Sequence, residues 1–251
     1  MLINLNDEWD NLPAENSYLM FWNEDRCGMV PGITMSSMLF CRHGGIITPV
    51  MSGQTTKLYA TNLDMAWYNY NAAIIKKMYA FNPKYNELIR QFREVYENNK
   101  SRYMGLAKQM GIPPELLAVI HYRENSADYM QGGFNVYLHN GQTLGQVTTI
   151  VPTGKLYTNF DDAALNAIAE KSSIIGKLNL TYETQDMTAM LCFLETYNGL
   201  GYYKNNRINP YLYSGTNVYI SGKYVADGVY DPNAVDNQVG GYILLDALLS
   251  K

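Results

Sequence analysis

The pattern of hydrophobic and polar residues changes near residue 82 of this 251-residue chain. Before it, short apolar runs are separated by Gly, Ser and Asn, which is typical of strands joined by turns. The runs cover residues 37–40, 45–50 and 57–60. Residues 65–80 look helical instead and could lead into the next domain. We predict a small β-rich region over residues 1–82 and a separate domain over residues 83–251.

After residue 82 the apolar spacing is that of helices. Apolar residues recur every three or four positions from Tyr85 to Met110, which predicts a helix that ends at Gly111. Pro113 and Pro114 open a second helix, because the N–H that proline lacks would be unpaired in a first turn anyway. This second helix is expected to run to about residue 125.

A short β element is expected after these two helices. Turn-forming residues at 139–141 and 152–154 enclose the β-branched run 147–151, which is typical of a strand. Helices then resume, and Asp161 and Asp162 predict the N-cap and acidic first turn of the next one. The remaining expected elements are a helix capped by Thr184 and ended by Gly199, a hairpin turning at Ser221-Gly222, and a helix from about Asp236. The predicted fold class is α+β, mainly helical with a small β element.

Glu124 stands out in the second helix. Positions 117, 120 and 124 are separated by three and four residues, so Glu124 shares a face with Leu117 and Ile120, at the C-terminal end where the helix dipole disfavours an anion. Burial and the dipole would both raise its pKa above the usual value of about 4.3. A glycosidase needs such a protonated carboxyl to protonate a leaving sugar oxygen. The simpler reading of the helix pattern is a glutamate that bends into solvent or pairs with Arg123 or His121.

Composition describes an ordered globular protein, with 47% hydrophobic and 17% charged residues. The net charge of −4 argues against a nucleic-acid-binding protein. The 22 tyrosines, together with many asparagines, suit flat hydrogen-bonding surfaces such as carbohydrate sites. The same composition could also reflect a genome rich in Tyr and Asn codons.

Three cysteines, Cys27, Cys41 and Cys192, make no disulfide framework. Cys27, Cys41 and His43 could supply zinc ligands, but their spacing matches no standard zinc module, and buried thiols are the simpler interpretation. We therefore predict no metal and no cofactor. The N-terminus carries acids where a secretory signal would carry Lys or Arg, and no apolar run reaches the ~20 residues that span a bilayer. We expect synthesis in the cytoplasm without a signal peptide, and no membrane insertion.

The stretch LLAVIHYREN, residues 116–125, resembles the end of the catalytic helix in the lysozyme superfamily, and goose-type lysozymes and lytic transglycosylases most of all. In those proteins the catalytic glutamate follows an A-x-I/V-x-x-x-E-S pattern, which Ala118, Ile120 and Glu124 match. Position 125 departs from it, because Asn replaces Ser there and Ser126 follows. Four further segments resemble bacterial and phage lysozyme-family proteins in the same order: 137–142, 197–202, 210–217 and 223–228.

The resemblance, which covers about residues 110–240, implies roles for particular residues. Glu124 is expected to be the general acid, and Tyr197 and Asn198 match the Tyr-Asn pair that lines the cleft beside it. The turn at His139 and Asn140 would bring polar groups to the far wall. From the residues alone, the tyrosines between 197 and 230 are suited to stacking on sugar rings, although several could be core residues. The substrate-binding candidates among them are Tyr202, Tyr211 and Tyr213.

A second carboxylate is left open. A base lies roughly 6.5–9.5 Å from the acid in an inverting glycosidase, and a nucleophile about 5–5.5 Å from it in a retaining one. Asp128, four residues past Glu124, is the preferred candidate, although it could instead cap a loop. Asp161 and Asp162 are further candidates. A lytic transglycosylase needs no second carboxylate, because a hydroxyl of the substrate attacks instead.

The segment 38–47, with Ser52-Gly53-Gln54, faintly resembles PAAR-like proteins that cap tail and secretion spikes. If residues 1–82 dock onto a phage tail or secretion apparatus, a wall-degrading enzyme needs no signal peptide. A phage endolysin released through a holin would need none either. In both cases the protein would act on the cell wall.

The sequence therefore predicts a peptidoglycan-cleaving glycosidase, a muramidase or a lytic transglycosylase, that cuts between N-acetylmuramic acid and N-acetylglucosamine. One alternative is a chitinase-like glycosidase. Another is a non-catalytic virion or secretion-apparatus protein with a lysozyme fold. The presence of Glu124 together with Tyr197 and Asn198 favours catalysis, because a binding protein would be free to lose the acid.

Overall fold

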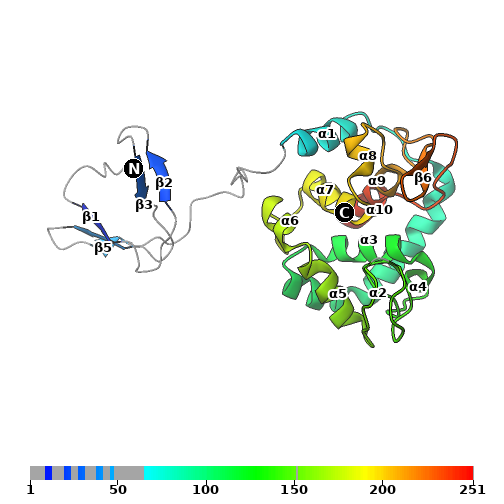
Figure 1. Cartoon of the computed structure of the whole chain (residues 1–251), viewed down its shortest axis with the longest axis horizontal. Helices are drawn as coiled ribbons and strands as arrows, with labels where there is room; N and C mark the ends of the chain where they lie inside the picture. Colours follow the sequence, from blue (N-terminus) through cyan, green and yellow to red (C-terminus); the bar gives the residue numbers. More distant parts are fainter. Residues whose placement is uncertain are drawn as a thin grey trace. The chain divides into compact units, whose positions relative to one another are not determined.

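The computed structural model describes residues 65–150 and 152–250, and the backbone of short strands between residues 9 and 47 (Figure 1). The chain divides into two compact units, residues 1–58 and residues 59–251. This division lies before residue 82, where the sequence pattern placed the change. The helix expected within residues 65–80 belongs to the second unit.

The described strands of the first unit pair in two antiparallel groups. Two of them, β4 (Met38–Cys41) and β5 (Ile46–Ile47), fall on the predicted runs 37–40 and 45–50, whereas the predicted run 57–60 lies outside the described residues. One group has the order β1 (Trp9–Leu12), β4 (Met38–Cys41), β5 (Ile46–Ile47), and the other pairs β2 (Met20–Asn23) with β3 (Gly28–Pro31).

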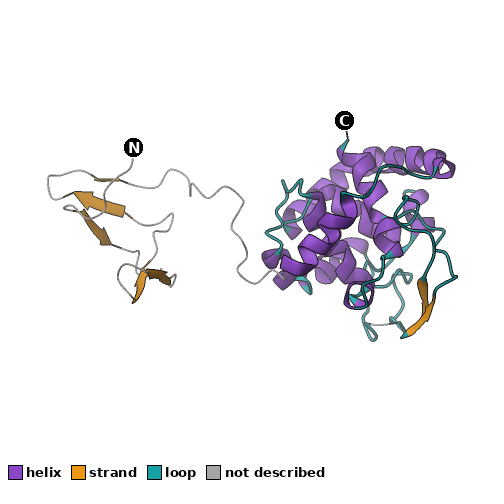
Figure 2. Cartoon of the chain, turned by 90° about the horizontal axis from the view of Figure 1, so that it is seen from above, coloured by secondary structure: helices purple, strands orange, loops and turns teal. Residues whose placement is uncertain are grey.

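The second unit is mainly helical and carries one described two-stranded sheet, β6 with β7 (Figure 2). Its helices are α1 (Met65–Ile75), the 3-10 turn η1 (Pro83–Tyr85), α2 (Asn86–Met110), α3 (Pro114–Glu124), α4 (Ser126–Met130), α5 (Phe160–Ala169), α6 (Ser172–Lys177), α7 (Met187–Asn198), α8 (Gly201–Lys204), α9 (Pro210–Tyr213) and α10 (Gly241–Leu249). Its strands are β6 (Lys223–Ala226) and β7 (Val229–Asp231).

The first two predicted helices are confirmed. Helix α2 ends at Gly111, whose φ of 68° is the left-handed conformation that glycine adopts without steric cost. Helix α3 begins at Pro114 and ends at Glu124. These boundaries follow from proline and glycine acting on the local backbone, which is why the sequence alone predicts them.

Helix α3 lies at the centre of the second unit and packs against α2, α4, α7 and α10 (Figure 1). Residues 116–123 are all buried, so the helix is surrounded by the core on every side. The apolar stripe that the sequence suggested is thus part of a fully buried helix. Glu124 differs from these residues because it is half-buried and lies where α3 leaves the core.

The strand predicted over residues 147–151 does not form in its described part, residues 147–150. Residues 146–150 form a loop, and Val136 and Thr143 make a single isolated bridge. Side chains take the place of a partner strand here: Gln142 Oε1 accepts from the N–H groups of Thr149 and Ile150. These two backbone N–H groups are thereby satisfied without a sheet.

The hairpin predicted to turn at Ser221-Gly222 does not form, and a hairpin of residues 223–231 lies just after that position. Strands β6 and β7 pair Tyr224 with Tyr230, and the chain turns at residues 227–228 rather than at Ser221-Gly222. Gly222 has a φ of 103°, and a Cβ atom there would lie 1.9 Å from the Tyr230 hydroxyl oxygen. This glycine therefore serves the close approach of an aromatic ring.

Two predicted helix caps are also wrong. Asn159 caps α5 and accepts from the N–H of Asp162, so Asp161 and Asp162 form the acidic first turn only. Asp186, not Thr184, caps α7, and the helix is followed by Gly199 as expected. The last helix begins at residue 241 rather than near 236, because Asp236 is engaged in the contacts described below.

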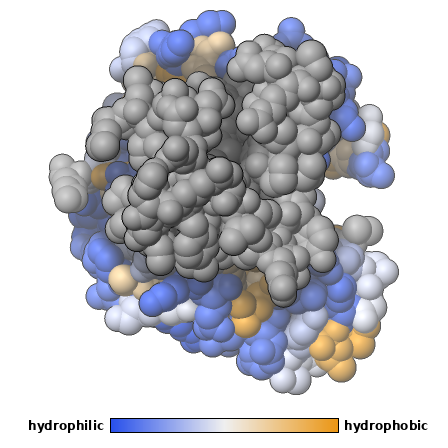
Figure 3. Space-filling model, turned by 90° about the vertical axis from the view of Figure 1, so that its left-hand side faces the viewer, coloured by the Kyte–Doolittle hydropathy of each residue, from blue (hydrophilic) through white to orange (hydrophobic). Residues whose placement is uncertain are grey.

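The surface of the second unit that is coloured in Figure 3 is mainly hydrophilic, with separate hydrophobic residues. Among the described residues, no helix is both long enough and apolar enough to cross a membrane.

Candidate functional site

A cleft of about 640 Å³ opens beside the C-terminal end of α3. Its lining comes from the ends of α3 and α7, from α8 and α9, from hairpin β6–β7 and from residues 236–238. The lining includes Glu124. Residues up to 115 positions apart in the sequence thus meet around one carboxyl group.

Glu124 has the environment of a carboxylic acid held near neutral pH. Burial raises its pKa to about 7, although a hydrogen bond from Tyr211 and the positive charges of Arg123 and Lys171 act in the opposite direction. The Tyr211 hydroxyl donates to Glu124 Oε1 across 2.9 Å. Both protonation states of Glu124 are therefore accessible close to neutrality.

The backbone at the end of α3 is held from two sides. The amide of Gln238 donates to the carbonyl oxygens of Tyr122 and Arg123, at 2.9 and 3.3 Å. On the other side, the amide of Asn125 donates to the carbonyl of Gly141 across 3.0 Å. The last turn of the helix is thereby fixed, and the position of the Glu124 backbone with it.

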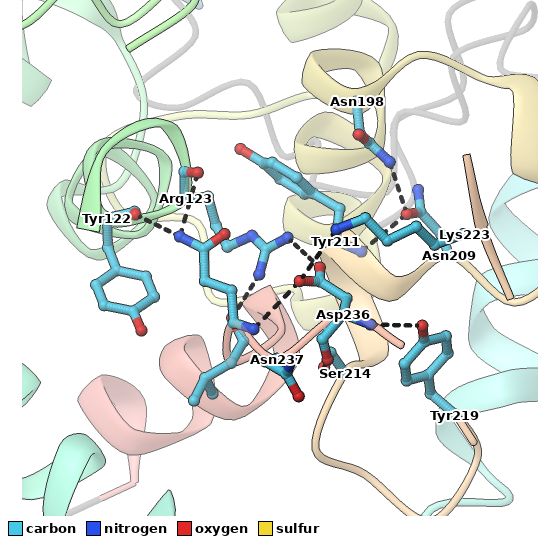
Figure 4. Close-up of polar contacts among 12 residues, drawn as sticks. Tyr122, Arg123, Asn198, Asn209, Tyr211, Ser214, Tyr219, Lys223, Asp236 and Asn237 are labelled. Carbon is cyan, nitrogen blue, oxygen red and sulfur yellow. Dashed lines mark hydrogen bonds and ion pairs between the residues drawn. The ribbon is translucent and has the colours of Figure 1, made fainter. Parts of the chain in front are cut away.

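Arg123 and Asp236 form a largely buried ion pair beside the cleft (Figure 4). Arg123 Nη2 donates to Asp236 Oδ2 at 3.0 Å, and Nη1 donates to the carbonyl of Val239 at 2.8 Å. The guanidinium also lies 4.4 Å from the ring centroid of Tyr211. Lys223 Nζ, on β6, approaches the other Asp236 oxygen to 3.8 Å. The pair holds Tyr211 against α3 and links the hairpin to the same point.

Tyr197 and Lys171 lie on another side of Glu124. The Tyr197 hydroxyl is buried and has no hydrogen-bond partner in the described structure. Burial and the nearby negative charges of Glu124 and Glu170 hold the pKa of Tyr197 well above its usual value. Lys171 Nζ lies 4.6 Å from the Tyr197 ring centroid and donates to the carbonyl of Thr196. This corner combines a neutral phenol and an ammonium group next to the acid.

Three tyrosines fix the hairpin beside the cleft. The rings of Tyr202 and Tyr224 meet edge to face at 4.9 Å, and those of Tyr224 and Tyr230 at 5.3 Å. The N–H of Tyr224 donates to the Tyr202 hydroxyl, and the Arg207 guanidinium lies 3.7 Å from the Tyr230 ring centroid. The cleft therefore has an aromatic wall that other aromatic and cationic groups hold in place.

The structure brings five predicted site residues to the cleft lining: Glu124, Tyr197, Asn198, Tyr202 and Tyr211. Tyr213 is not among them, and its position argues against the predicted role in substrate binding. It is fully buried, and its hydroxyl donates to Asn71 Oδ1 across 2.6 Å. Alternate residues of the short helix α9 face different ways, which a run of tyrosines does not reveal.

His139 and Asn140 lie behind the site and not in the cleft lining. His139 Nε2 is 3.5 Å from Glu170 Oε2, and the Asn140 amide donates to the carbonyl of Ile150. Their turn contacts Glu124 through Gly141, where a Cβ atom would lie 2.2 Å from the Glu124 carbonyl oxygen. The turn thus supports the acid through the backbone.

Asp128 does not line the cleft, which argues against a catalytic role. Its carboxylate contacts His121 Nε2 at 3.1 Å and accepts from the N–H and the amide of Asn135. Burial alone would raise the pKa of Asp128, but these hydrogen bonds outweigh it and lower the pKa to about 2. The loop-capping alternative is the one that the contacts support.

Asp161 and Asp162 are also engaged elsewhere. Asp161 pairs with Arg102 at 2.7 Å, and Asp162 accepts from the amide of Asn159. Besides Glu124, the acids in the cleft lining are Asp227, which is exposed at the hairpin turn, and Asp236, which is paired with Arg123.

Within the described ranges, no group of three or more His, Cys, Asp or Glu side chains could hold a metal ion. Of the zinc-ligand candidates, Cys41 lies in β4, and Cys27 and His43 fall outside the described residues. Cys192 is a buried free thiol in the helical unit.

The sequence analysis missed several residues around the acid. Lys171, Asp236 and Gln238 carry no local signal, because each reaches Glu124 or its neighbours only through the tertiary fold. Lys223 lies in the segment 223–228 that resembles lysozyme-family proteins, but nothing in that segment marks the lysine itself.

Comparison of the chain with protein families, with curated proteins and with solved structures found no match. The function proposed below therefore rests on the contacts of the site and on the sequence pattern.

Proposed function

We propose that the second unit, residues 59–251, is a peptidoglycan-cleaving glycosidase that cuts between N-acetylmuramic acid and N-acetylglucosamine with Glu124 as general acid. The observation that carries the proposal is a carboxyl group with a pKa of about 7 in a cleft with an aromatic wall. General acid catalysis is most effective when the pKa lies near the working pH. The sequence resemblance in residues 110–240 supports the choice of substrate.

The contacts of Glu124 support both halves of an acid–base cycle. The protonated carboxyl would donate its proton to the leaving glycosidic oxygen. The carboxylate left behind would be stabilised by the hydrogen bond from Tyr211 and by the charges of Arg123 and Lys171. It could then take a proton from the group that attacks the anomeric carbon, which returns Glu124 to its starting state.

We favour a lytic transglycosylase over a hydrolase with a second catalytic carboxylate. In the cleft lining, Asp236 is bound to Arg123 and Asp227 is exposed at the hairpin turn, so neither has the setting of a nucleophile or base. In a transglycosylase a hydroxyl of the muramyl residue attacks its own anomeric carbon and forms an anhydro ring. Glu124 alone would then serve as acid and base.

A muralytic assay on peptidoglycan with product analysis tests this proposal. The full chain should clear a peptidoglycan suspension, and Glu124→Gln should lower the rate by about 10²-fold or more, in line with loss of a general acid. Asp128→Asn is the matched control, because it removes a carboxylate nearby in sequence that does not line the cleft. Equal rates for wild type and Glu124→Gln would refute the role of Glu124.

Mass spectrometry of the released fragments separates the two chemistries. Anhydro-muramyl ends would support the transglycosylase, and reducing ends would show a hydrolase instead. Cleavage of chitin at a comparable rate would favour the chitinase-like alternative. Glycan binding without cleavage by the wild type would point to a non-catalytic protein. Delivery by a phage tail, secretion apparatus or holin remains a prediction about residues 1–82.

A further inference from the structure

A fully buried carboxylate lies beneath the cleft in the core of the second unit. Glu195, on α7, accepts hydrogen bonds from the indole of Trp67 at 2.7 Å and from the amide of Asn71 at 3.0 Å, both on α1. Its other oxygen accepts from the amide of Asn209 at 3.2 Å. Stability alone does not require such a group, because well-packed apolar residues of similar volume often serve as well.

Asn209 connects this carboxylate to the cleft. It is the N-cap of α9, and its Oδ1 accepts from the N–H of Tyr211 at 3.0 Å and from the amide of Asn198 at 2.9 Å. One buried amide thus contacts the carboxylate on one side and two cleft residues on the other, as Figure 4 shows for the cleft side.

Hydrogen-bonding chemistry sets the direction of these contacts. Both Glu195 oxygens accept from N–H groups in this structure, so the NH₂ group of Asn209 faces the core. The amide oxygen must then face Tyr211 and Asn198, both of which present N–H groups. If the Asn209 amide were flipped, its NH₂ group would face the N–H groups of Tyr211 and Asn198. Its oxygen would then face the carboxylate oxygen of Glu195.

The orientation of Asn209 affects Glu124 through a single residue, Tyr211. Asn209 fixes the start of α9, and α9 carries the Tyr211 hydroxyl that donates to Glu124. The other groups near Glu124 come from elsewhere: Arg123 precedes it on α3, Lys171 precedes α6, and Tyr197 lies on α7. Tyr211 is therefore the neighbour of Glu124 whose position Asn209 governs directly.

We propose that Glu195 and Asn209 are positioning residues of this cleft. Glu195 orients the Asn209 amide, and Asn209 in turn holds Tyr211 against Glu124 and Asn198 in the cleft wall. A role in catalysis rests on the proposed glycosidase function, but the effect on Glu124 does not, because it can be measured without substrate.

The test is the titration of Glu124 in the full-length protein, followed by carbon-13 NMR of labelled glutamate and assigned by comparison with Glu124→Gln. Tyr211→Phe removes the hydrogen bond directly and should raise the titration midpoint by about one pH unit, the effect of losing one hydrogen bond to a charged group. Asn209→Ala should shift the midpoint in the same direction. In the Tyr211→Phe background, Asn209→Ala should add nothing further.

Asn209→Ser separates the two contacts of the Asn209 oxygen. Serine still caps a helix, so the N–H of Tyr211 keeps an acceptor and the Glu124 midpoint should return towards that of the wild type. The shorter side chain cannot also hold Asn198, so KM for glycan should rise while kcat changes less. Glu195→Gln, which offers a single acceptor oxygen to three donors, should shift the midpoint as Asn209→Ala does but by less.

Tyr129→Phe is the control for loss of stability. It deletes a buried hydrogen bond to the carbonyl of Phe92, away from the cleft, and should lower Tm without moving the Glu124 midpoint. If Asn209→Ala also lowers Tm and leaves the midpoint where it is, Glu195 and Asn209 are structural and the proposal is overturned. A wild type without glycosidase activity would refute the proposed function and leave this titration test intact.

Discussion

The hydroxyl of Tyr211 and the carboxyl of Glu124 lie 2.9 Å apart although 87 positions separate them in the chain. The contact opposes the effect of burial on Glu124, because a hydrogen bond to the carboxylate lowers its pKa whereas desolvation raises it. The balance of the two places the pKa of Glu124 near 7, and most of what we expect from this protein depends on that balance.

Glu124 should make the protein less stable as the pH rises. Its pKa is raised from 4.5 to about 7 on folding, so the folded state resists ionisation, and stability is lost as the pH rises from about 4.5 through 7. Glu124→Gln stays neutral at every pH. We expect the variant to exceed the wild type by up to about 3 kcal/mol in unfolding free energy at pH 8 and to match it near pH 4. Urea unfolding at both pH values measures this difference. Equal stability of variant and wild type at pH 8 would mean that folding does not raise the pKa of Glu124.

The rate of glycan cleavage should fall above a pH of about 7, because the general acid must be protonated. In Tyr211→Phe the alkaline limb should move up by about one pH unit, since the hydrogen bond that stabilises the carboxylate is lost. The pH dependence of kcat/KM, measured for wild type and for Tyr211→Phe, gives the alkaline limb of each. An alkaline limb at the same pH in both proteins would show that a group other than Glu124 titrates there.

Asp128→Asn should reduce stability and leave the chemistry intact. The carboxylate is held by His121 and Asn135, and losing such charge-assisted contacts costs about 1–3 kcal/mol. Because the pKa of Asp128 is lowered from 3.8 to about 2, its contribution is present above pH 4 and is lost as the pH falls towards 2. Unfolding at pH 7 and pH 3 should show a smaller difference between variant and wild type at the lower pH. A large loss of kcat at full folding would restore Asp128 as a catalytic candidate.

Gly141→Ala should displace Glu124, whereas Gly145→Ala should not. Both glycines have positive φ values, 69° and 80°, so both variants carry similar backbone strain. At Gly141 the new Cβ would lie 2.2 Å from the Glu124 carbonyl, whereas at Gly145 nothing lies within 4 Å. Activity per folded molecule should therefore fall in Gly141→Ala alone. Equal activity in the two variants would mean that the turn does not support the acid.

A chain that begins at residue 59 should be more stable than one that begins at residue 83. Helix α1 supplies two of the hydrogen bonds to Glu195 and buries Trp67 and Ile74 in the core, and its removal loses both the hydrogen bonds and the packing. We expect the shorter chain to lose several kcal/mol, or to fail to fold, as thermal unfolding would measure. Equal Tm values for the two chains would place the domain boundary at residue 82 after all.

Local chemistry made parts of the fold predictable from the sequence. Gly111 requires a left-handed conformation that ends α2, and Pro114 suits a first helical turn, so these boundaries depend on neighbouring residues alone. The same reasoning placed Glu124 at the end of a helix. Local patterns failed for the caps of α5 and α7, where several polar residues compete and packing selects one.

The resemblance to lysozyme-family proteins pointed to Tyr197 and Asn198, and the tyrosine-rich stretch pointed to Tyr202 and Tyr211; all four line the cleft with Glu124. Tyr211, a predicted substrate-binding residue, lines the cleft and donates to the acid, whereas Tyr213, two positions later, is buried against Asn71. Which face of a four-residue helix points to the cleft depends on the core beneath it.

The sequence by itself determined that a carboxyl group stands at the end of a helix, because proline, glycine and apolar spacing act over a few residues. Only the tertiary structure decided that this carboxyl group has a pKa near 7, because that value depends on burial and on Tyr211, Arg123 and Lys171. It also decided that Asp128 is tied to His121 and that α1 completes the shell of Glu195. The pKa of a group depends on all the groups that lie near it in space, and folding brings together groups that are far apart in the sequence.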